Sequence, residues 1–308
     1  MEIRLLKREE IEEPKWNGCV HYAANSKIYG YTWYLDNVTS EWMGLVEGDY
    51  QSVFPLVWND KLFKIKQIYQ PHLCQQLGLF TVNVRSKERI SQFLAAIPDE
   101  FKYWDIPLND GNASVMQLKE YEVVSQPNYL LQLNKPYEEL YAAYSKNTKR
   151  NIKKGRNSNL FLTGNMAPDK FVETVKQAQE AKGIKHPDAL YHTASRIIWN
   201  CLHRGKGAIT AAYNADQELC AAIFFIFDKA ALINLLNVTT IKGKEVGAMA
   251  YLLDATIQRE ADTHRHIDFE GSSVEGIARF YESFGAQNEP YYKVTKNELP
   301  WWIRWRRR

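Results

Sequence analysis

Two acidic residues close a short apolar run late in the chain, HIDFE. Side chains alternate between the faces of a β-strand, so His266, Asp268 and Glu270 would share one face. A serine-rich turn follows, and there Ser272 and Glu275 have the spacing of a capping box at a helix start. Acids between a strand end and a helix start lie where open α/β sheets bind ligands. They could equally just stabilise the exposed amides of the helix.

The helix expected after Ser273 carries the second chemically interesting group. Val274, Ile277, Ala278 and Tyr281 have the spacing of one helix face, which we expect to pack inward. Gly285 suits the helix end. Tyr281 therefore either fills the core with its hydroxyl paired or presents that hydroxyl to a site.

A metal site is the third possibility for this segment. His266, Asp268 and Glu270 are all possible ligands. Three alternating strand residues with no further cluster are weak support for a metal, and we expect none.

A basic stretch, SKNTKRNIKKGR, lies near the middle of the chain. Its helical spacing gathers four cations on one stripe, namely Lys146, Lys149, Arg150 and Lys153. Such a stripe either holds phosphates of a nucleotide, a coenzyme A or an RNA acceptor stem, or is a solvated helix face. Gln75 and Gln76 are polar residues among apolar ones, and if buried they need a backbone or ligand partner.

The overall composition narrows the class of protein. The 308 residues are 45% hydrophobic and 24% charged, which is ordinary for a globular protein. The net charge of only +3 argues against a protein that binds nucleic acid over most of its surface. The four cysteines are far apart and the N-terminus lacks an apolar signal core, so a cytoplasmic protein is expected. The sequence has no Walker loop, dinucleotide fingerprint, nucleophile elbow or HExxH motif.

The order of expected elements is the same in both halves: strand, helix, antiparallel meander, helix, strand. In the first half, Gly48-Asp49 and Asn59-Asp60 are the expected hairpin turns. The repetition predicts two similar α/β (α+β) domains, residues 1–135 and 136–308, with mixed, mostly antiparallel sheets flanked by helices. Residues 136–157 would be a basic helical linker at the start of the second domain.

This order, with ARFYESFGA as a late helix, resembles the GNAT (GCN5-related N-acyltransferase) fold. A tandem pair of such domains with DFEG and FYESFG in the second is similar to the FemAB family of peptidoglycan-bridge aminoacyltransferases. The stretches QPHLCQQLGLF and YSKNTKRNIKKGR also resemble FemAB-like proteins. The resemblance covers most of the chain.

The resemblance implies an N-acyltransferase that moves an acyl or aminoacyl group from acyl-CoA or aminoacyl-tRNA to an amine, such as one on a cell-wall precursor. Glu270, with Asp268, would be the base and Tyr281 the acid. Residues 232–239 would present backbone amides to the acyl carbonyl, in a cleft between the domains or along the second one. The phosphate- and substrate-binding candidates are Lys149, Arg150, Lys153, Gly243, Gly247, Gln75 and Gln76.

An inactive GNAT-like module that binds a nucleotide, RNA or a cell-envelope precursor is the alternative. The acyl-CoA enzymes carry a glycine-containing turn before the long helix, and the corresponding stretch here is IKGKEVGAMA. It keeps Gly243 and Gly247 without the full spacing. The sequence then ends in WWIRWRRR, which resembles an interfacial anchor, although we expect its tryptophans to pack on the body.

Overall fold

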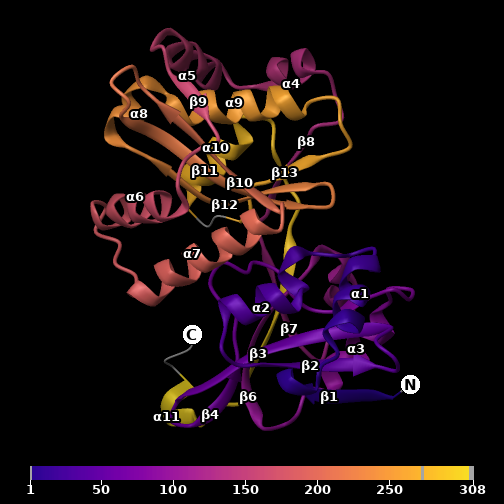
Figure 1. Ribbon diagram of the computed structural model, residues 1–308. Helices are drawn as coiled ribbons and strands as arrows, with labels where there is room; N and C mark the ends of the chain where they lie inside the picture. Colours follow the sequence, from indigo (N-terminus) through magenta and orange to yellow (C-terminus); the bar gives the residue numbers. More distant parts are fainter. Residues whose placement is uncertain (1, 272–273, 305–308) are drawn as a thin grey trace. The chain divides into compact units, whose positions relative to one another are not determined.

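The computed structural model describes residues 2–271 and 274–304, and its contacts divide the chain into two units. The first unit combines residues 1–126 with residues 290–308, and the second comprises residues 127–289. Each unit has its own sheet with helices packed against it (Figure 1). The tandem α/β architecture with mostly antiparallel sheets is therefore as the sequence predicts.

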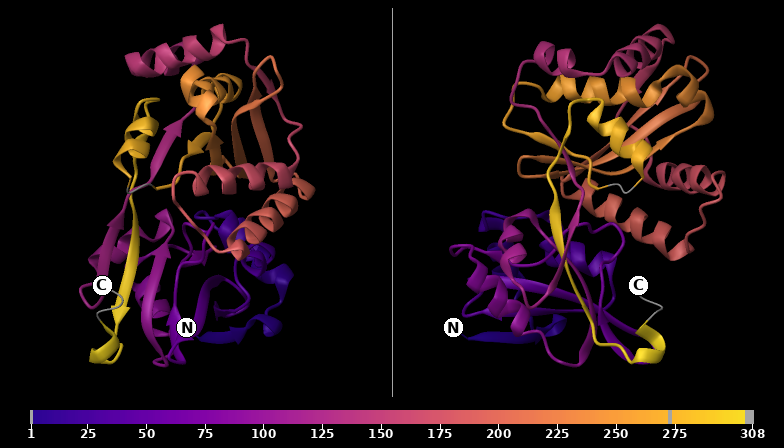
Figure 2. Two further views of the ribbon diagram at one scale, coloured as in Figure 1. Left: turned by 90° about the vertical axis from the view of Figure 1, so that its left-hand side faces the viewer. Right: turned by 180° about the vertical axis from the view of Figure 1, so that it is seen from behind.

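The first sheet has the strand order β1-β2-β3-β4-β6-β15-β7, and β5 pairs with β3. Among the described strands of this sheet, β4 and β6 are the neighbouring pair that runs parallel. Its strands are β1 (Ile3–Lys7), β2 (Trp42–Glu47), β3 (Ser52–Leu62), β4 (Ile65–Ile68), β5 (Phe80–Thr81), β6 (Phe101–Leu108), β7 (Glu122–Gln126) and β15 (Tyr291–Asn297). In Figure 2, β15 is the long yellow strand that runs through this unit.

The α-helices in the described part of the first unit are α1 (Glu13–Tyr22), α2 (Thr32–Val38), α3 (Lys87–Ala95) and α11 (Trp301–Arg304). Ser86 caps α3 by accepting a hydrogen bond from the amide of Arg89, as its position before a helical pattern predicts. Ile90, Phe93 and Leu94 then bury one face of α3 against the sheet. Three short 3-10 turns complete the unit, at Arg8–Glu10, Ile28–Gly30 and Asp110–Gln117.

The second sheet has the order β14-β8-β13-β12-β11-β10-β9. As in the first sheet, one neighbouring pair, β12 with β13, is parallel. The strands are β8 (Tyr129–Gln132), β9 (Phe161–Thr163), β10 (Gly207–Tyr213), β11 (Leu219–Asp228), β12 (Ala231–Thr239), β13 (His266–Asp268) and β14 (Gln287–Asn288).

Helices cover both faces of the second sheet. Figure 1 shows α5 and α9 along one face and α6 and α7 along the other. The bounds are α4 (Tyr137–Ala143), α5 (Lys146–Asn157), α6 (Pro168–Glu180), α7 (Asp188–His203), α8 (Ile241–Val246), α9 (Ala248–Glu260) and α10 (Glu275–Glu282). The inner strands of this sheet are buried on both faces, and β11 accordingly reads as a nearly continuous apolar run.

The domain limits differ from the expected ones at two places. The expected boundary after residue 135 falls beyond β8, but β8 pairs with β13 and so belongs to the second unit. The last strand, β15, belongs to the first unit because it lies between β6 and β7. Strand pairing across long sequence separations decided both assignments.

Several local expectations are also corrected. The turn expected at Asn59-Asp60 lies inside β3, which continues to Leu62 and turns at Phe63-Lys64. β13 ends at Asp268, and Glu270 has a left-handed backbone (φ 57°), so the alternation of faces does not extend to Glu270.

The expected helix after the serine-rich turn begins at Glu275, with Val274 as its N-cap. The capping role expected for Ser272 lies outside the described residues. Val274 and Ile277 are exposed by 58% and 42%, so the buried face of α10 is narrower than its sequence spacing suggests. None of the described helices combines the length and apolarity needed to cross a membrane.

Candidate functional site

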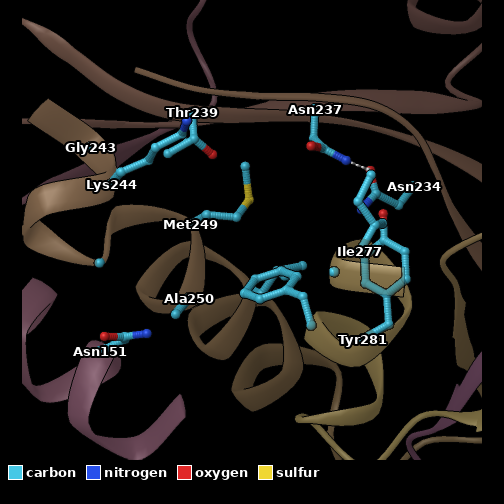
Figure 3. A pocket seen from close by; sticks show the side chains of 14 residues that line it. Asn151, Asn234, Asn237, Thr239, Gly243, Lys244, Met249, Ala250, Ile277 and Tyr281 are labelled. Carbon is cyan, nitrogen blue, oxygen red and sulfur yellow. Dashed lines mark hydrogen bonds between the residues drawn. The ribbon is translucent and has the colours of Figure 1, made fainter. Parts of the chain in front are cut away.

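The second sheet opens where β12 and β13 part. Their parallel pairing covers only Ala231–Ile233 against His266–Asp268, and the rest of β12 runs along β11. A cavity of about 430 Å³ lies at this opening, within the size range of small-molecule sites. Its lining residues come from β12, α5, α8, α9 and α10 and include Asn151, Asn234, Asn237, Lys244, Met249, Ile277, Phe280 and Tyr281 (Figure 3).

A β-bulge in β12 shapes one wall of the cavity. The β11 partners Phe224 and Phe225 pair with Leu236 and Asn234, so Leu235 is the extra residue. Residues three apart on a regular strand face opposite sides, and one extra residue brings them to the same side. Asn234 and Asn237 therefore meet, and the Asn237 amide donates a hydrogen bond to the Asn234 oxygen at 3.2 Å (Figure 3).

Tyr281 of α10 presents its hydroxyl to the same cavity. The ring is 7% exposed and stacks on Phe269, with ring centroids 4.4 Å apart. Burial raises the pKa of Tyr281 to about 12; a hydrogen bond with Asn237 acts in the opposite direction, and the charge of Glu270 adds to the rise. The hydroxyl is therefore protonated at neutral pH and available as a hydrogen-bond donor.

The two candidate acids do not form part of the cavity wall. Asp268 is 2% exposed, and its carboxylate accepts a hydrogen bond of 2.9 Å from the Glu270 amide, which stabilises the turn after β13. Glu270 is half-buried and close enough for its charge to act on Tyr281. Among the described residues, Tyr281 lines the cavity, whereas Asp268 and Glu270 do not.

Gly243 and Gly247 both line the cavity, and close packing explains why they are glycines. A Cβ at Gly243 would lie 1.9 Å from the carbonyl oxygen of Cys220. Gly247 has φ 70°, and a Cβ there would lie 2.5 Å from the carbonyl oxygen of Asn151. Gly247 thus ends α8, turns the chain into α9 and lets α5 approach closely.

The amino-terminal turn of α9 opens toward the cavity. Gly247 precedes it, and no side chain caps the amides of this turn. Met249 and Ala250 of the same turn line the cavity, and Lys244 lies across from them (Figure 3). Exposed amides at a helix start carry partial positive charge and bind anions, so this end of the cavity suits a negatively charged group.

The predicted basic stripe lies on α5, whose Thr148, Ile152 and Gly155 face inward. Lys149 donates to the carbonyl oxygen of Ala142 at 2.9 Å, and Arg150 to the Asn147 oxygen at 2.7 Å. Lys153 is exposed to solvent. The α5 residue that lines the cavity is Asn151, so the stripe does not form the cavity wall.

Gln75 and Gln76 belong to the first unit, in a segment that fills the place equivalent to the open cavity. Strand β4 parts from β6 after Ile68, but the chain returns, and Leu77 forms a parallel bridge to Leu108. The amide of Leu77 donates to the carbonyl oxygen of Pro107 at 2.9 Å. The Gln76 oxygen accepts from the amide of Asp110, so this side chain is paired within the fold.

Five side chains that line the cavity were not among the predicted site residues: Asn151, Asn234, Asn237, Lys244 and Met249. One signal was present: two asparagines three residues apart in the apolar run ALINLLNV. A buried asparagine requires partners, and Asn234 is only 4% exposed. The bulge that makes the pair meet depends on the neighbouring strand and leaves no local mark in the sequence.

No protein-family model and no curated protein matches the chain in sequence. Among solved structures, a tandem GNAT protein from the clavulanic acid biosynthesis pathway aligns with 97% of this chain and 99% of its own, at a TM-score of 0.54 and 12% identity. The chain therefore has the tandem GNAT-like fold. FemX aligns with a TM-score of 0.69 and 11% identity over 96% of this chain and 97% of its own.

L-PGS from Bacillus licheniformis has the same architecture, with a TM-score of 0.56 and 9% identity over 96% of this chain and 94% of its own. The resemblance to the FemAB-like branch is thus confirmed at the level of the fold.

Proposed function

We propose that the second unit is an N-acyltransferase site that moves an acyl or aminoacyl group from an activated ester or thioester to an amine. The observation that carries the proposal is the cavity where β12 and β13 part, with the uncapped first turn of α9 at one end and the protonated Tyr281 hydroxyl at the other. A donor with phosphate groups and an activated acyl group needs both features along one cavity.

Each part of the cavity has a role in this reaction. The first turn of α9, with Lys244, would hold phosphate of the donor, and the basic stripe on α5 would extend that attraction. The segment of β12 beyond Ile233 would direct backbone amides to the acyl carbonyl, where negative charge develops during attack. Ile277 and Phe280 would supply apolar contact to the acyl group.

The chemistry is direct transfer. The amine nitrogen attacks the acyl carbon, and the carbon–sulfur or carbon–oxygen bond to the leaving group breaks. Glu270 would take the amine proton, directly or through water, with Asp268 fixing the turn that holds it. The Tyr281 hydroxyl would donate to the departing thiolate or alkoxide. An amine on a cell-wall precursor is one acceptor of the right chemistry.

The donor is identified by thermal shift with acetyl-CoA, longer acyl-CoAs, UDP-sugars and tRNA, since a ligand that binds only the folded state raises its stability. Product formation with candidate amines then tests the activity. A donor that stabilises the protein without any transfer would favour the alternative, an inactive module that binds a nucleotide, RNA or a cell-envelope precursor. The four buried, free cysteines suit a reducing compartment such as the cytoplasm for either role.

Removing the Tyr281 hydroxyl is the sharpest test of the roles. We expect Tyr281→Phe, and separately Glu270→Gln, to lower turnover by roughly a hundredfold or more if these groups transfer protons. Tyr191→Phe is the matched control, because Tyr191 is also 7% exposed and hydrogen-bonded, to Gln179, but lies outside the cavity lining. Normal turnover in Tyr281→Phe would contradict its role as the donor.

A further inference from the structure

Three large apolar side chains are exposed together on the first unit. Trp301 is 84% exposed, Trp302 48% and Phe63 58%. The rings of Trp302 and Phe63 are in edge contact, with centroids 5.2 Å apart. Trp301 and Trp302 are on α11 and Phe63 is in the loop just before β4, and Figure 1 shows α11 and β4 next to each other. We call these three residues the aromatic patch; the expectation that the tryptophans pack on the body is wrong for Trp301.

The patch is held in place by its neighbours. Leu299 and Ile303 are buried at 0% and 1% exposure, so one side of α11 is anchored in the first unit. The carbonyl oxygen of Pro300 accepts hydrogen bonds from the amides of Ile303 and Arg304 at 3.0 and 3.1 Å. Because Ile303 points inward, Trp301 and Trp302 are directed outward by the fold of the segment.

Phe63 lies in a turn whose backbone conformation is unfavourable for a bulky aromatic residue. Leu62 pairs with Ile65, so Phe63 and Lys64 form a two-residue hairpin loop, with φ 54° and 61°. Positive φ at both positions favours Asn-Gly and disfavours a bulky aromatic residue. The sequence holds Asn59-Asp60 a few residues earlier, yet that pair lies within β3. A residue that strains its turn and remains exposed contributes little to the fold and points to a role at the surface.

Three cations lie on the two segments that carry the patch, namely Lys61, Lys64 and Arg304. The side chain of Lys64 is 87% exposed and forms an ion pair with Asp60 at 3.4 Å. Tryptophan together with arginine and lysine is the combination that suits the headgroup boundary of a bilayer, and the cations add attraction to anionic lipids.

We propose that the aromatic patch docks the protein on the surface of a bilayer that contains anionic phospholipids. The inference is independent of the acyltransferase proposal, since it involves no residue of the cavity. RNA would also be attracted by the charges, but the edge contact between Trp302 and Phe63 takes up ring surface, which leaves Trp301 as the one ring of the patch open to a stacking base. Insertion into the interface needs only that the apolar surface be removed from water.

Flotation of the full chain with vesicles tests the proposal. The vesicles are phosphatidylcholine alone or phosphatidylcholine with phosphatidylglycerol. We expect binding to the anionic vesicles that weakens with added salt, and a loss of about tenfold or more in Trp301→Ala/Trp302→Ala. Trp199→Ala is the matched control, since Trp199 is 51% exposed but lies on α7.

Phe63→Asn separates docking from folding. Asparagine tolerates the left-handed backbone, so thermal stability should be equal or higher while vesicle binding falls. The proposal is overturned if the wild-type chain does not bind anionic vesicles, or if the double variant binds them equally well. Binding of tRNA through these residues without vesicle binding would overturn the proposal. So would light scattering that gives the mass of a dimer for the wild-type chain and of a monomer for the double variant, because the patch would then be covered by a second copy.

Discussion

At the scale of single residues, Tyr281 connects the fold to the proposed chemistry. Its ring belongs to the core of the second unit, stacked on Phe269, while its hydroxyl reaches the cavity beside Asn237. Burial favours the neutral phenol, so Tyr281 both packs its ring in the core and supplies its hydroxyl as a hydrogen-bond donor. Asp268, the last residue of β13, fixes the backbone of the following turn, and Glu270 in that turn acts through its charge.

The raised pKa of Tyr281 predicts a specific loss of stability at alkaline pH. The folded protein holds this proton up to about pH 12, whereas an unfolded tyrosine releases it near pH 10. The stabilisation is complete below about pH 10 and is lost as the pH rises through about 12. Between about pH 9 and about pH 11 the free energy of unfolding should fall by about 1 kcal/mol more in wild type than in Tyr281→Phe.

Urea unfolding at the two pH values measures this difference. Tyr137 and Tyr144 also have pKa values raised by burial, but they are present in both proteins and cancel. An equal fall in stability in wild type and Tyr281→Phe would show that the hydroxyl is not buried as described.

At the scale of elements, the short helix α8 organises the anion-binding end of the cavity. The hydroxyl of Thr240 accepts from the amide of Gly243 at 3.0 Å and so starts the helix. Two lysines then emerge in different directions. Lys242 pairs with Glu218 at 2.6 Å, whereas Lys244 lines the cavity.

This division predicts that only one of the two lysines matters for the donor. We expect Lys244→Ala to weaken binding of a phosphate-bearing donor by about tenfold or more, because an ionic hydrogen bond is lost. Lys242→Ala is the matched control, and the donor affinity should be unchanged. Isothermal titration calorimetry on both variants measures the effect, and equal weakening would mean that general charge, rather than the cavity, attracts the donor.

At the scale of the whole molecule, the second unit is continuous in sequence, whereas the first unit is completed by chain that follows the second. β8 lies at the start of the second unit and joins β13 and β14 of the second sheet. β15 follows the second unit and lies between β6 and β7 of the first sheet. The chain therefore builds most of the first unit, then the whole second unit, and returns to the first, so the units are not two successive halves of the sequence.

Ending the chain at Glu289 should therefore damage the first unit and spare the second. Without β15, both β6 and β7 lose a strand partner, so amide hydrogen exchange should accelerate in residues 101–126. Protection of β11 should persist, because its partners are β10 and β12. Mass spectrometry of peptides from both regions measures this, with a chain ending at Arg304 as the control. Preserved protection of β6 would contradict the central place of β15.

Sequence pattern alone determined the kinds of elements and the tandem fold. Apolar alternation, turn residues and helix caps act over a few residues, so the meanders and helices such as α3 could be predicted from neighbours in the chain. The same pattern misplaced the turn at Asn59-Asp60, because pairing with β4 outweighed local turn preference.

Only the tertiary structure decided where the cavity lies and what lines it. Tyr281 was foreseeable from its motif, but its meeting with Asn237 depends on a bulge set by β11 and on the early parting of β13. The first unit has the same parallel pair, yet Leu77 fills the gap there. Such cavities are opened or filled by pairing between segments that are distant in the sequence. The local sequence around a residue therefore does not predict them.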